Sequence, residues 1–566
     1  MAVVDTLTQL VQQAVDAAGW ELIVPPVQAS KSADHGDYQS NCAFRLSKVA
    51  RDKPLAIAET LAASLPQHPA ISRVEVAAPG FLNLSLDTAW LGAALADQLN
   101  EPRLGVAERQ GLVVIDYSSP NVAKRMHVGH LRSTVIGAAL DRMARFAGHE
   151  VVADNHIGDW GTQFGKLIVA WDLWLDPAAF DEDAVGELER IYVKFSQEAD
   201  GALEDRAREE TAKLQEGDPR NRELWQRFLD ASLAEYDKLY GRLGISFEVV
   251  YGESFYNAML KPLVQELIDS GVAEESRGAI VIPFDKSDGK GLAETPMLIQ
   301  KADGASLYGT TDLATVRYRL DTWQPTKIIY VTDTRQQHHF RQLFAACKKL
   351  GWVDEGVLEH VWFGLLSLPG GAMSSRKGNV IRLQDVLDES VSRARAVVDE
   401  KSSMLPDEER AAIAEAVGVA AVRYADLSQN PQSNVVFEWE KMLALDGNTA
   451  VFLMYSLART CSIQARGGLP QELAPFTPEH PVERELTGAL LRFPDAFDLA
   501  LATNKPSVLC EYLFSLSKTF NHFYFELKVL DSTGNDRNTR TNLVEATRRV
   551  LHQGVTLLGI TPLERM

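Results

Sequence analysis

The segment Ser118-Ser-Pro-Asn-Val-Ala-Lys-Arg-Met-His-Val-Gly-His-Leu-Arg-Ser-Thr134 lies between two kinds of apolar pattern. The run before it, Leu112–Tyr117, is typical of a buried parallel strand. After it, apolar residues recur at helical spacing from Leu131 to Phe146, and a second apolar run follows at Glu150–Asp154. Strand, loop, helix and strand in this order form a βαβ unit, which predicts a doubly wound, Rossmann-type parallel sheet.

The rest of the chain extends this pattern in both directions. Apolar runs at Ala279–Phe284, Lys327–Val331 and His360–Phe363 predict further strands of the same sheet. Beyond Leu383 the spacing is helical almost to the end, and the first hundred residues mix one helical stripe with two alternating runs. We therefore expect a multidomain α/β plus all-α protein. The predicted domains are an N-terminal α+β module at 1–105, a catalytic sheet domain at 106–385 with a helical insertion at about 175–245, and a helical-bundle C-terminal region at 386–566.

Composition narrows the class of protein. The 566 residues carry 57 Lys and Arg against 77 Asp and Glu, a formal net charge of -20. Such acidity argues against a general nucleic-acid coat or a membrane-surface protein, although a local basic strip can still bind RNA. The four cysteines have neither metal-ligand nor redox spacing, and no signal peptide or membrane-spanning run is visible. We expect a cytoplasmic protein without a structural metal.

The motif His127-Val-Gly129-His130 is suited to nucleotide chemistry. A helix N-terminus attracts phosphate, and the missing side chain of Gly129 lets a nucleotide approach the backbone. The two histidines can donate hydrogen bonds to oxygens that gain charge as pyrophosphate leaves. Ordinary core or surface histidines are the alternative, but the strand before the motif and the helix after it favour the nucleotide site.

A second polar segment, Ala372-Met-Ser-Ser-Arg-Lys-Gly-Asn379, follows the last predicted strand. Arg376 and Lys377 are placed to neutralise the β- and γ-phosphates, as mobile basic loops do in phosphoryl-type chemistry. The alternative is a solvated basic turn. The presence of the first motif favours the phosphate role.

Together these segments resemble the two signatures of class I aminoacyl-tRNA synthetases, in the form found in arginyl-tRNA synthetases. Residues 118–134 match the first signature, and Met373–Asn379 resembles the second. The resemblance covers nearly the whole chain, since Pro79–Asn83 matches the N-terminal module of arginyl enzymes and Thr519–Tyr524 their C-terminal domain. It implies an arginine–tRNA ligase, acting on L-arginine, ATP with Mg²⁺ and an arginine-accepting tRNA. It further implies a monomer, a C-terminal anticodon-binding domain, and activation that requires bound tRNA.

The second signature departs from the general class I form, because Ala372 and Ser375 stand where two lysines are usual. Many arginyl enzymes share this departure, and the resemblance implies that Lys124 supplies the missing charge. The division of labour among Lys124, Arg376 and Lys377 stays open. The ATP-binding residues implied are His127, Gly129, His130, Met373, Ser374 and Ser375. By analogy with nucleotide-binding folds, we expect Asp333, at a strand end, to meet the ribose hydroxyls.

A guanidinium substrate needs carboxylates and planar acceptors around it. The resemblance assigns the arginine-binding residues as Asn121, Glu253, Tyr308, Asp312 and Gln336. Of these, Asn121 and Gln336 would hold the α-amino end. As alternatives, Asp312 is a plausible cap for a helix that begins near Leu313, and Glu253 an ordinary surface carboxylate.

The signal for RNA is weaker. The resemblance points to Phe81 and Asn83 at the D-loop, and Phe523 and Tyr524 lie where stacking surfaces for anticodon bases are expected. Helical spacing suits the C-terminal aromatics equally well to a core.

Three rival functions stay open at this point. A small-molecule nucleotidylyltransferase would explain the sheet but neither flanking region. A non-catalytic RNA-binding relative would not need intact His127, His130, Lys124 and Asp312. A synthetase for another amino acid is the nearest rival, and the carboxylates at 253 and 312 argue against apolar or acidic substrates.

Overall fold

The computed structural model describes residues 3–30, 35–302, 304–367 and 381–566. The chain forms two compact units. One comprises Arg109–Leu443, and the other combines Met1–Glu108 with Ala444–Met566. Among the described residues, no helix is long and apolar enough to cross a membrane.

The larger unit is built on a four-stranded parallel sheet in the order β11-β10-β5-β6. Its strands are β5 (Leu112–Asp116), β6 (Glu150–Asp154), β10 (Lys327–Asp333) and β11 (Leu358–Phe363). The predicted parallel sheet is therefore confirmed. Successive strands run outward to opposite sides of the β5–β10 pair, so the carboxyl ends of β5 and β10 form a switch point, where ligands bind in folds of this kind.

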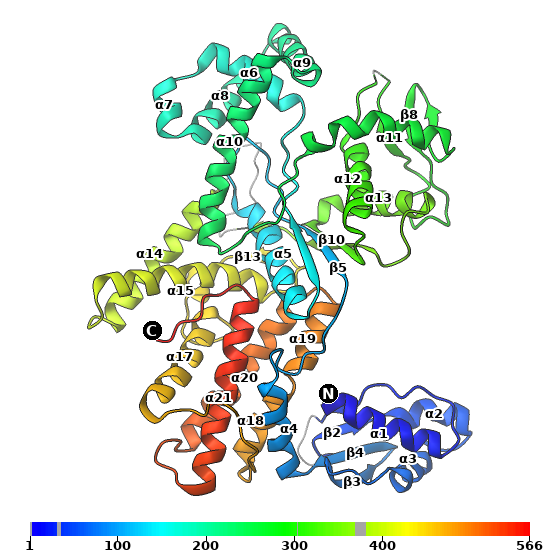
Figure 1. Cartoon of the computed structure of the whole chain (residues 1–566), viewed down its shortest axis with the longest axis vertical. Coiled ribbons are helices and arrows are strands. Elements are labelled where there is room, and N and C mark those ends of the chain that lie inside the picture. The colour runs from blue at the N-terminus through cyan, green and yellow to red at the C-terminus, as the bar shows by residue number, and fades with distance from the viewer. Residues whose placement is uncertain (1–2, 31–34, 303, 368–380) are drawn as a thin grey trace. The chain divides into compact units, whose positions relative to one another are not determined.

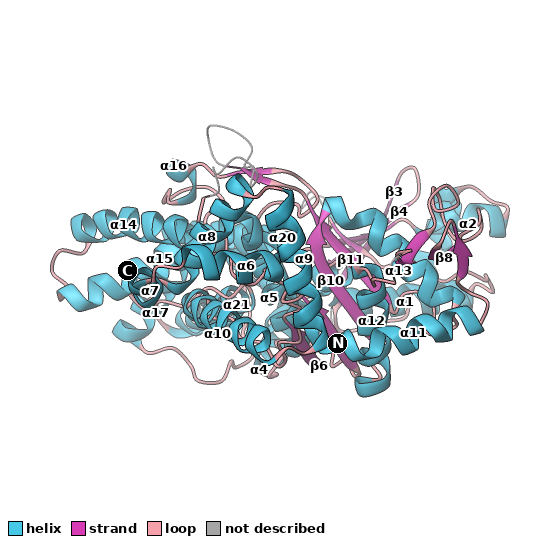
Figure 2. Ribbon diagram, turned by 90° about the horizontal axis from the view of Figure 1, so that it is seen from above, coloured by secondary structure: helices cyan, strands magenta, loops and turns pink. Residues whose placement is uncertain are grey.

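Helices cover both faces of this sheet. Figure 2 shows α5 (Val128–Phe146) on one side of the strands, with α12 (Tyr308–Trp323) and α13 (Gln337–Lys349) on the other. The second face is packed by an apolar cluster that joins strand and helix side chains, among them Val114, Ile328, Leu313, Val316 and Leu343. Burial of this cluster holds the switch-point edge on a rigid base.

The insertion between β6 and β10 contains α6 (Thr162–Trp174), α7 (Pro177–Glu182), α8 (Ala184–Glu198), α9 (Gly201–Glu216) and α10 (Pro219–Arg242). The last four begin at aspartates whose side chains accept backbone amide hydrogens of the first turn. These caps are Asp176, Asp183, Asp200 and Asp218. Each satisfies a donor that the helix itself leaves free, which explains why the charged stretch divides into short helices at these points.

One predicted strand belongs elsewhere. Residues Ala279–Ile282 form β8, which pairs antiparallel with β7 (Glu274–Ser276) and β9 (Met297–Gln300) in a separate sheet. The prediction that this run continues the parallel sheet is wrong. Arg277 and Gly278, at φ 54° and 81°, turn β7 directly into β8 as a two-residue hairpin. A short apolar run alone does not reveal which sheet will receive it.

Just before the second signature lies β12 (Leu366–Ser367). After it the larger unit continues with α14 (Leu383–Lys401), α15 (Asp407–Leu427), β13 (Val435–Val436) and α16 (Trp439–Met442). It also contains α11 (Asn257–Asp269). Helices α14 and α15 pack against each other, and β12 pairs with β13. The helical character predicted beyond Leu383 is confirmed.

The smaller unit begins with α1 (Val3–Ala17), α2 (Cys42–Ala50), α3 (Pro54–Ser64) and α4 (Thr88–Asn100). These helices accompany an antiparallel sheet of β1 (Gln28–Ala29), β2 (Tyr38–Ser40), β4 (Phe81–Leu86) and β3 (Ile71–Ala77). The unit ends with α17 (Ala450–Gly467), α18 (Pro481–Leu491), α19 (Phe493–Ala502), α20 (Pro506–Glu526) and α21 (Gly534–Leu557), shown in orange to red in Figure 1. An α+β module and a helical region are both present, as predicted.

A buried ion-pair cluster joins the neighbouring strands β5 and β6 to α12. Arg319 is fully buried, and its Nη2 donates to Asp116 at 2.6 Å and to Asp154 at 2.7 Å. Asp116 ends β5 and Asp154 ends β6. Burial raises the pKa of Asp154, and the neighbouring Arg319 guanidinium opposes that rise. The cluster fixes the position of α12 on the carboxyl ends of both strands.

Substituting Arg319→Met would leave two buried carboxylates side by side without a counter-charge. We expect the free energy of unfolding to fall by about 3–5 kcal/mol. Urea-induced unfolding of the full chain, followed by tryptophan fluorescence, measures this loss, because most tryptophans lie in the larger unit.

The matched control is Arg317→Met, two residues earlier on the same helix. Its ion pairs to Asp321 and Glu266 are exposed and contribute about 1 kcal/mol or less. Equal losses for the two variants would contradict the role given to Arg319.

Candidate active site

The two motif histidines form a compact pair at the start of α5. His127 precedes the helix in extended backbone, and its Nδ1 accepts from the Gly129 amide at 3.0 Å. The Nδ1 of His130 accepts from the His127 amide at 3.0 Å, and the ring centroids lie 3.9 Å apart. Because each Nδ1 is an acceptor, the hydrogen-bond network assigns the ring proton of both residues to Nε2.

Both histidines are held neutral. Burial lowers the pKa of His127, with further lowering by Arg335 and Lys124. Burial and the neighbouring His127 lower the pKa of His130 to about 3. Each ring can therefore donate one Nε2–H without carrying a charge. The positive potential at this end of α5 comes from Lys124 and Arg335 instead.

Gly129 is required here by the His127 ring. A Cβ at this position would lie 2.7 Å from Cε1 and 2.8 Å from Nδ1 of that ring. The space that the missing side chain leaves is thus occupied by the histidine, whereas the sequence suggested room for a nucleotide.

Strand β10 ends beside this pair with Asp333 and Arg335. The Asp333 carboxylate caps the short 3₁₀ helix η3 (Thr334–Gln336), accepts from the Arg335 amide at 2.8 Å and forms an ion pair with the Arg335 guanidinium. Sequence reasoning singled out Asp333 and missed Arg335. The sequence feature that could have identified Arg335 is its position just beyond the end of a predicted strand of the parallel sheet. Gln336 ends η3 and is exposed.

The predicted second-signature residues lie outside the described residues: Met373, Ser374, Ser375, Arg376 and Lys377. The chain on either side of that segment is held by the first signature. Residue Val128 donates its amide to Ile381 at 3.1 Å, and Leu383 donates to Met126 at 3.0 Å. On the other flank, Gly364 accepts from the Arg132 guanidinium at 2.7 Å.

Arg132 is buried one turn past the histidines. Its Nε donates to Asp426 of α15 at 2.7 Å, and its Nη1 reaches the carbonyl of Ser433 at 2.8 Å as well as that of Gly364. The start of α5 therefore anchors both flanks of the second signature.

Glu253 opens a second part of the site, in the 3₁₀ helix η2 (Glu253–Tyr256). Its amide donates to the carbonyl of Ile157 at 3.1 Å, which ties it to the segment after β6. Asp159 of that segment accepts from the amide of Ser254 at 2.8 Å and from its hydroxyl at 2.5 Å. Gly252 allows this approach, because a Cβ there would lie 2.3 Å from the Asp159 carboxylate.

Asp312 faces the same region from α12. The helix begins at Tyr308, so Asp312 lies in its second turn and does not cap it. The Oδ2 atom of Asp312 lies 2.5 Å from Nε2 of His339, and the His339 ring meets the Tyr308 ring edge-on at 5.3 Å between centroids. Sequence reasoning missed His339, although it too follows the end of β10.

The electrostatics of this region are those of a site for a cation. Burial raises the pKa of Glu253 to about 7; His156 counteracts this rise, and Asp312 and Asp159 add to it. Burial is the main cause of the rise, and the charges of Asp312 and Asp159 act on the same carboxyl. The sequence had identified two of these three carboxylates. Asp159 and His156 were missed, and their signal was their position just after a predicted strand of the sheet.

Asn121 and Lys124 lie on the loop between β5 and α5. Asn121 pairs with Gly158 through backbone hydrogen bonds of its neighbours, and a Cβ on Gly158 would lie 2.2 Å from the Asn121 Oδ1. The Lys124 Nζ lies 5.0 Å from the ring centroid of Tyr192 on α8. Both side chains are exposed. The larger unit thus brings the predicted residues 121, 124, 127 and 130 onto one segment.

The residues predicted to contact tRNA belong to the smaller unit. Asn83 is buried and accepts from Gln39 at 2.8 Å, whereas Phe81 is half-buried. Phe523 is fully buried, so its ring has no surface to offer a base. Tyr524 is 39% exposed, with the guanidinium of Arg459 at 5.1 Å from its ring centroid.

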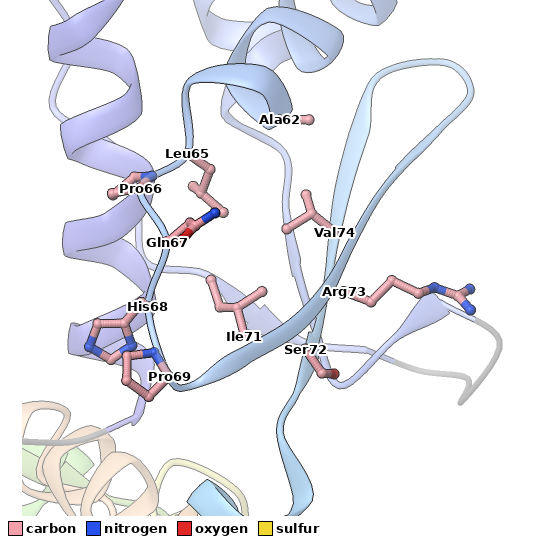
Figure 3. A pocket seen from close by; sticks show the side chains of 10 residues that line it. All are labelled: Ala62, Leu65, Pro66, Gln67, His68, Pro69, Ile71, Ser72, Arg73 and Val74. Atoms are coloured by element: carbon pink, nitrogen blue, oxygen red, sulfur yellow. The ribbon is translucent and has the colours of Figure 1, made fainter.

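A pocket of about 630 Å³ lies on the N-terminal module between the end of α3 and β3 (Figure 3). Pro66, His68, Ile71 and Arg73 are among its lining residues. It contains none of the residues that the sequence singled out.

Comparisons with known proteins agree along the whole chain. Residues 93–439 match the family described as tRNA synthetases class I (R), catalytic domain. Residues 5–86 match the arginyl tRNA synthetase N terminal domain, and 453–566 the DALR anticodon binding domain.

Full-length relatives give the same result. The chain is 45% identical to an arginine–tRNA ligase of Fusobacterium nucleatum over 569 residues, covering 99% of each, and 43% identical to one of Chloroflexus aggregans over 537 residues, covering 92% of each. Its fold resembles the arginyl-tRNA synthetase of Thermus thermophilus with a TM-score of 0.85 at 26% identity, covering 100% of both chains. That of Plasmodium falciparum gives a TM-score of 0.86 at 27% identity, covering 100% of this chain and 99% of the other. The chain therefore belongs to the arginyl-tRNA synthetases of class I.

Proposed function

We propose that the chain activates L-arginine with ATP·Mg²⁺ and transfers it to the 3′ end of an arginine-accepting tRNA. In the first step the arginine carboxylate oxygen bonds to the α-phosphorus of ATP, and pyrophosphate leaves. In the second step a terminal ribose hydroxyl of the tRNA attacks the activated carbonyl, and AMP leaves. The observation that carries the proposal is that the acidic cluster of Glu253, Asp312 and Asp159 and the histidine pair both lie on segments that leave the carboxyl edge of the parallel sheet.

The phosphate end of the site is assigned to His127, His130, Lys124 and the second-signature loop, with Arg335 as a further cation. Two neutral Nε2–H donors and fixed cations stabilise charge that develops on the phosphates without accepting a proton themselves. Because positioning and electrostatics suffice for this reaction, no protein nucleophile is needed. We assign Asp333 to the ribose, which requires its carboxylate to be shared between the ribose and Arg335.

The arginine end is assigned to Glu253, Asp312 and Tyr308, with Asn121 and Gln336 at the α-amino group. A bound guanidinium would relieve the repulsion between the Glu253 and Asp312 carboxylates and offer planar N–H donors to both. Support comes from the raised pKa of Glu253, which burial causes first and which the neighbouring Asp312 and Asp159 increase.

For tRNA we propose a division of labour by domain. Residues 1–105 contact the tRNA body through the surface around Phe81 and Asn83, residues 106–385 carry the chemistry, and residues 386–566 include the anticodon-binding domain. Tyr524 and the cation of Arg459 beside it offer an exposed stacking surface. We also propose that a monomer performs the reaction and that activation requires bound tRNA.

Arginine-dependent exchange of pyrophosphate into ATP, with and without arginine tRNA, tests the function. We expect exchange with tRNA and little without it. His130→Ala should lower the exchange rate about 100-fold, because a preorganised donor to the phosphates is lost. Binding of tRNA should be unchanged in that variant, as measured by a gel-shift or filter assay. Exchange driven by another amino acid would contradict the proposal, as would loss of tRNA binding without a loss of exchange.

Asp312→Ala tests the pocket. Removing a carboxylate from a partly desolvated guanidinium site should raise the arginine KM about 100-fold and lower kcat. Steady-state exchange kinetics give both constants. The control is Asp321→Ala, an exposed carboxylate on the same helix that pairs only with surface Arg317 among its described contacts, and it should leave both constants unchanged. Near-normal arginine kinetics for Asp312→Ala would remove that residue from the site.

The raised pKa of Glu253 predicts a pH dependence of arginine binding. Below about pH 7 this carboxyl gains a proton and no longer offers a charge to the guanidinium, which itself stays protonated. The arginine KM should therefore rise by up to tenfold per pH unit below 7 and level off above it. Glu253→Gln should give a high KM that no longer varies across this range. The pKa of His130, about 3, keeps that residue out of this titration. An arginine KM of the wild-type enzyme that does not vary with pH would contradict the assignment of Glu253 to the arginine site.

A further inference from the structure

The loop between β5 and α5 is held in a shape that its sequence does not favour. Three residues that are not glycine have left-handed backbone there, Ser118 at φ 73°, Ser119 at φ 49° and Ala123 at φ 61°. Left-handed backbone is strained for these residues and persists only where surrounding contacts fix it. The same loop carries Asn121 and Lys124, so its shape decides where these two side chains point.

Helix α10 of the insertion supplies those contacts from one face. Ser232, Tyr236 and Tyr240 are spaced one turn apart and all three are buried. Ser232 Oγ accepts from the Ala123 amide at 2.9 Å, and the Tyr240 hydroxyl lies 2.8 Å from the Ser118 hydroxyl. In Figure 1, α10 extends from the insertion toward the start of α5, where this loop ends.

Tyr236 makes the most specific of these contacts. Its hydroxyl lies 2.7 Å from the carbonyl oxygen of Asn121 and 2.9 Å from that of Lys124. One donor thus fixes the two peptide groups that flank the segment Val122–Lys124. These contacts hold the backbone of the two residues assigned to substrates, while their own side chains stay exposed.

The side chains of the two residues between Asn121 and Lys124 also hold the loop against the insertion. Val122 and Ala123 are buried in the apolar core of the insertion, together with Phe164 and Phe228. Ser232 donates its own hydroxyl hydrogen to the carbonyl of Phe228 at 2.7 Å, which leaves a lone pair for the Ala123 amide. Both the backbone and the apolar side chains of the loop therefore depend on the insertion.

We propose that Ser232, Tyr236 and Tyr240 are positioning residues for arginine activation. They fix the backbone from which Asn121 reaches the amino acid and Lys124 reaches the phosphates, and this inference rests on the proposed roles of those two residues. The helical insertion is thereby part of the active-site framework, because α10 holds the backbone of Asn121, Ala123 and Lys124 through side-chain hydrogen bonds.

Tyr236→Phe in the full chain removes a single oxygen and tests the inference. We expect kcat/KM for arginine in tRNA-dependent pyrophosphate exchange to fall about tenfold, with the arginine KM raised. The control is Tyr512→Phe, which loses a hydroxyl bond to the carbonyl of Ala489 at 3.1 Å in the other unit. It should lower the melting temperature by a similar amount and leave the arginine KM unchanged. If Tyr236→Phe instead lowers kcat only in proportion to a smaller fraction of active enzyme and leaves the arginine KM unchanged, the role of Tyr236 is purely structural. That result would overturn the inference.

Asn121→Ala, alone and combined with Tyr236→Phe, separates the role of Asn121 from the positioning role of Tyr236. If Tyr236 acts through the loop, the double variant should lose less than the product of the single losses. If Asn121→Ala leaves the arginine KM unchanged, the assignment of Asn121 fails and the inference fails with it. If Asn121→Ala raises the KM and Tyr236→Phe does not, or if the two losses multiply, only the positioning inference is overturned.

Discussion

The guanidinium of Arg319 lies between the carboxylates of Asp116 and Asp154, where β5 and β6 end. Each strand leads from that junction into a segment of the site, β5 into the signature loop and β6 into the segment that carries Asp159. Arg319 and Asp312 lie two helical turns apart on α12. The ion pairs that fix Arg319 therefore also fix the position of Asp312 relative to the strand ends. Breaking this cluster would leave buried charge uncompensated and release all three elements at once.

The carboxyl edge of the sheet carries two opposite fields. On one side burial raises the pKa of Glu253, and Asp312 and Asp159 add to the rise. On the other side burial lowers the pKa of His127, and Arg335 and Lys124 lower it further. A substrate with a cationic side chain and a reacting carboxylate suits the first field, and a triphosphate suits the second. The histidines are neutral and fixed by backbone amides. They contribute N–H donors to the active site without adding charge to either field.

Patterns of neighbouring residues predicted much of this from the sequence. The apolar runs around residues 112, 150, 327 and 360 are strands of the parallel sheet, because strands buried on both faces need continuous apolar residues. The run at 279–282 has the same composition but joins a hairpin, since only the turn at Arg277 and Gly278 decides its partner. Phe523 is a similar case. Helical spacing predicts which face of a helix a residue lies on, but it does not show whether other helices bury that face, as they bury Phe523.

The sequence by itself determined the family, the parallel sheet and the identity of the signature residues, because these depend on short patterns and on local spacing. Only the tertiary structure decided that Arg335, His339, Asp159 and His156 join them, and that the insertion holds the loop of Asn121 and Lys124. These residues come from separate strand ends, and their partnership depends on strand order, which no local pattern contains. Tyr236 illustrates the point, since it lies more than one hundred residues from the carbonyls that it holds.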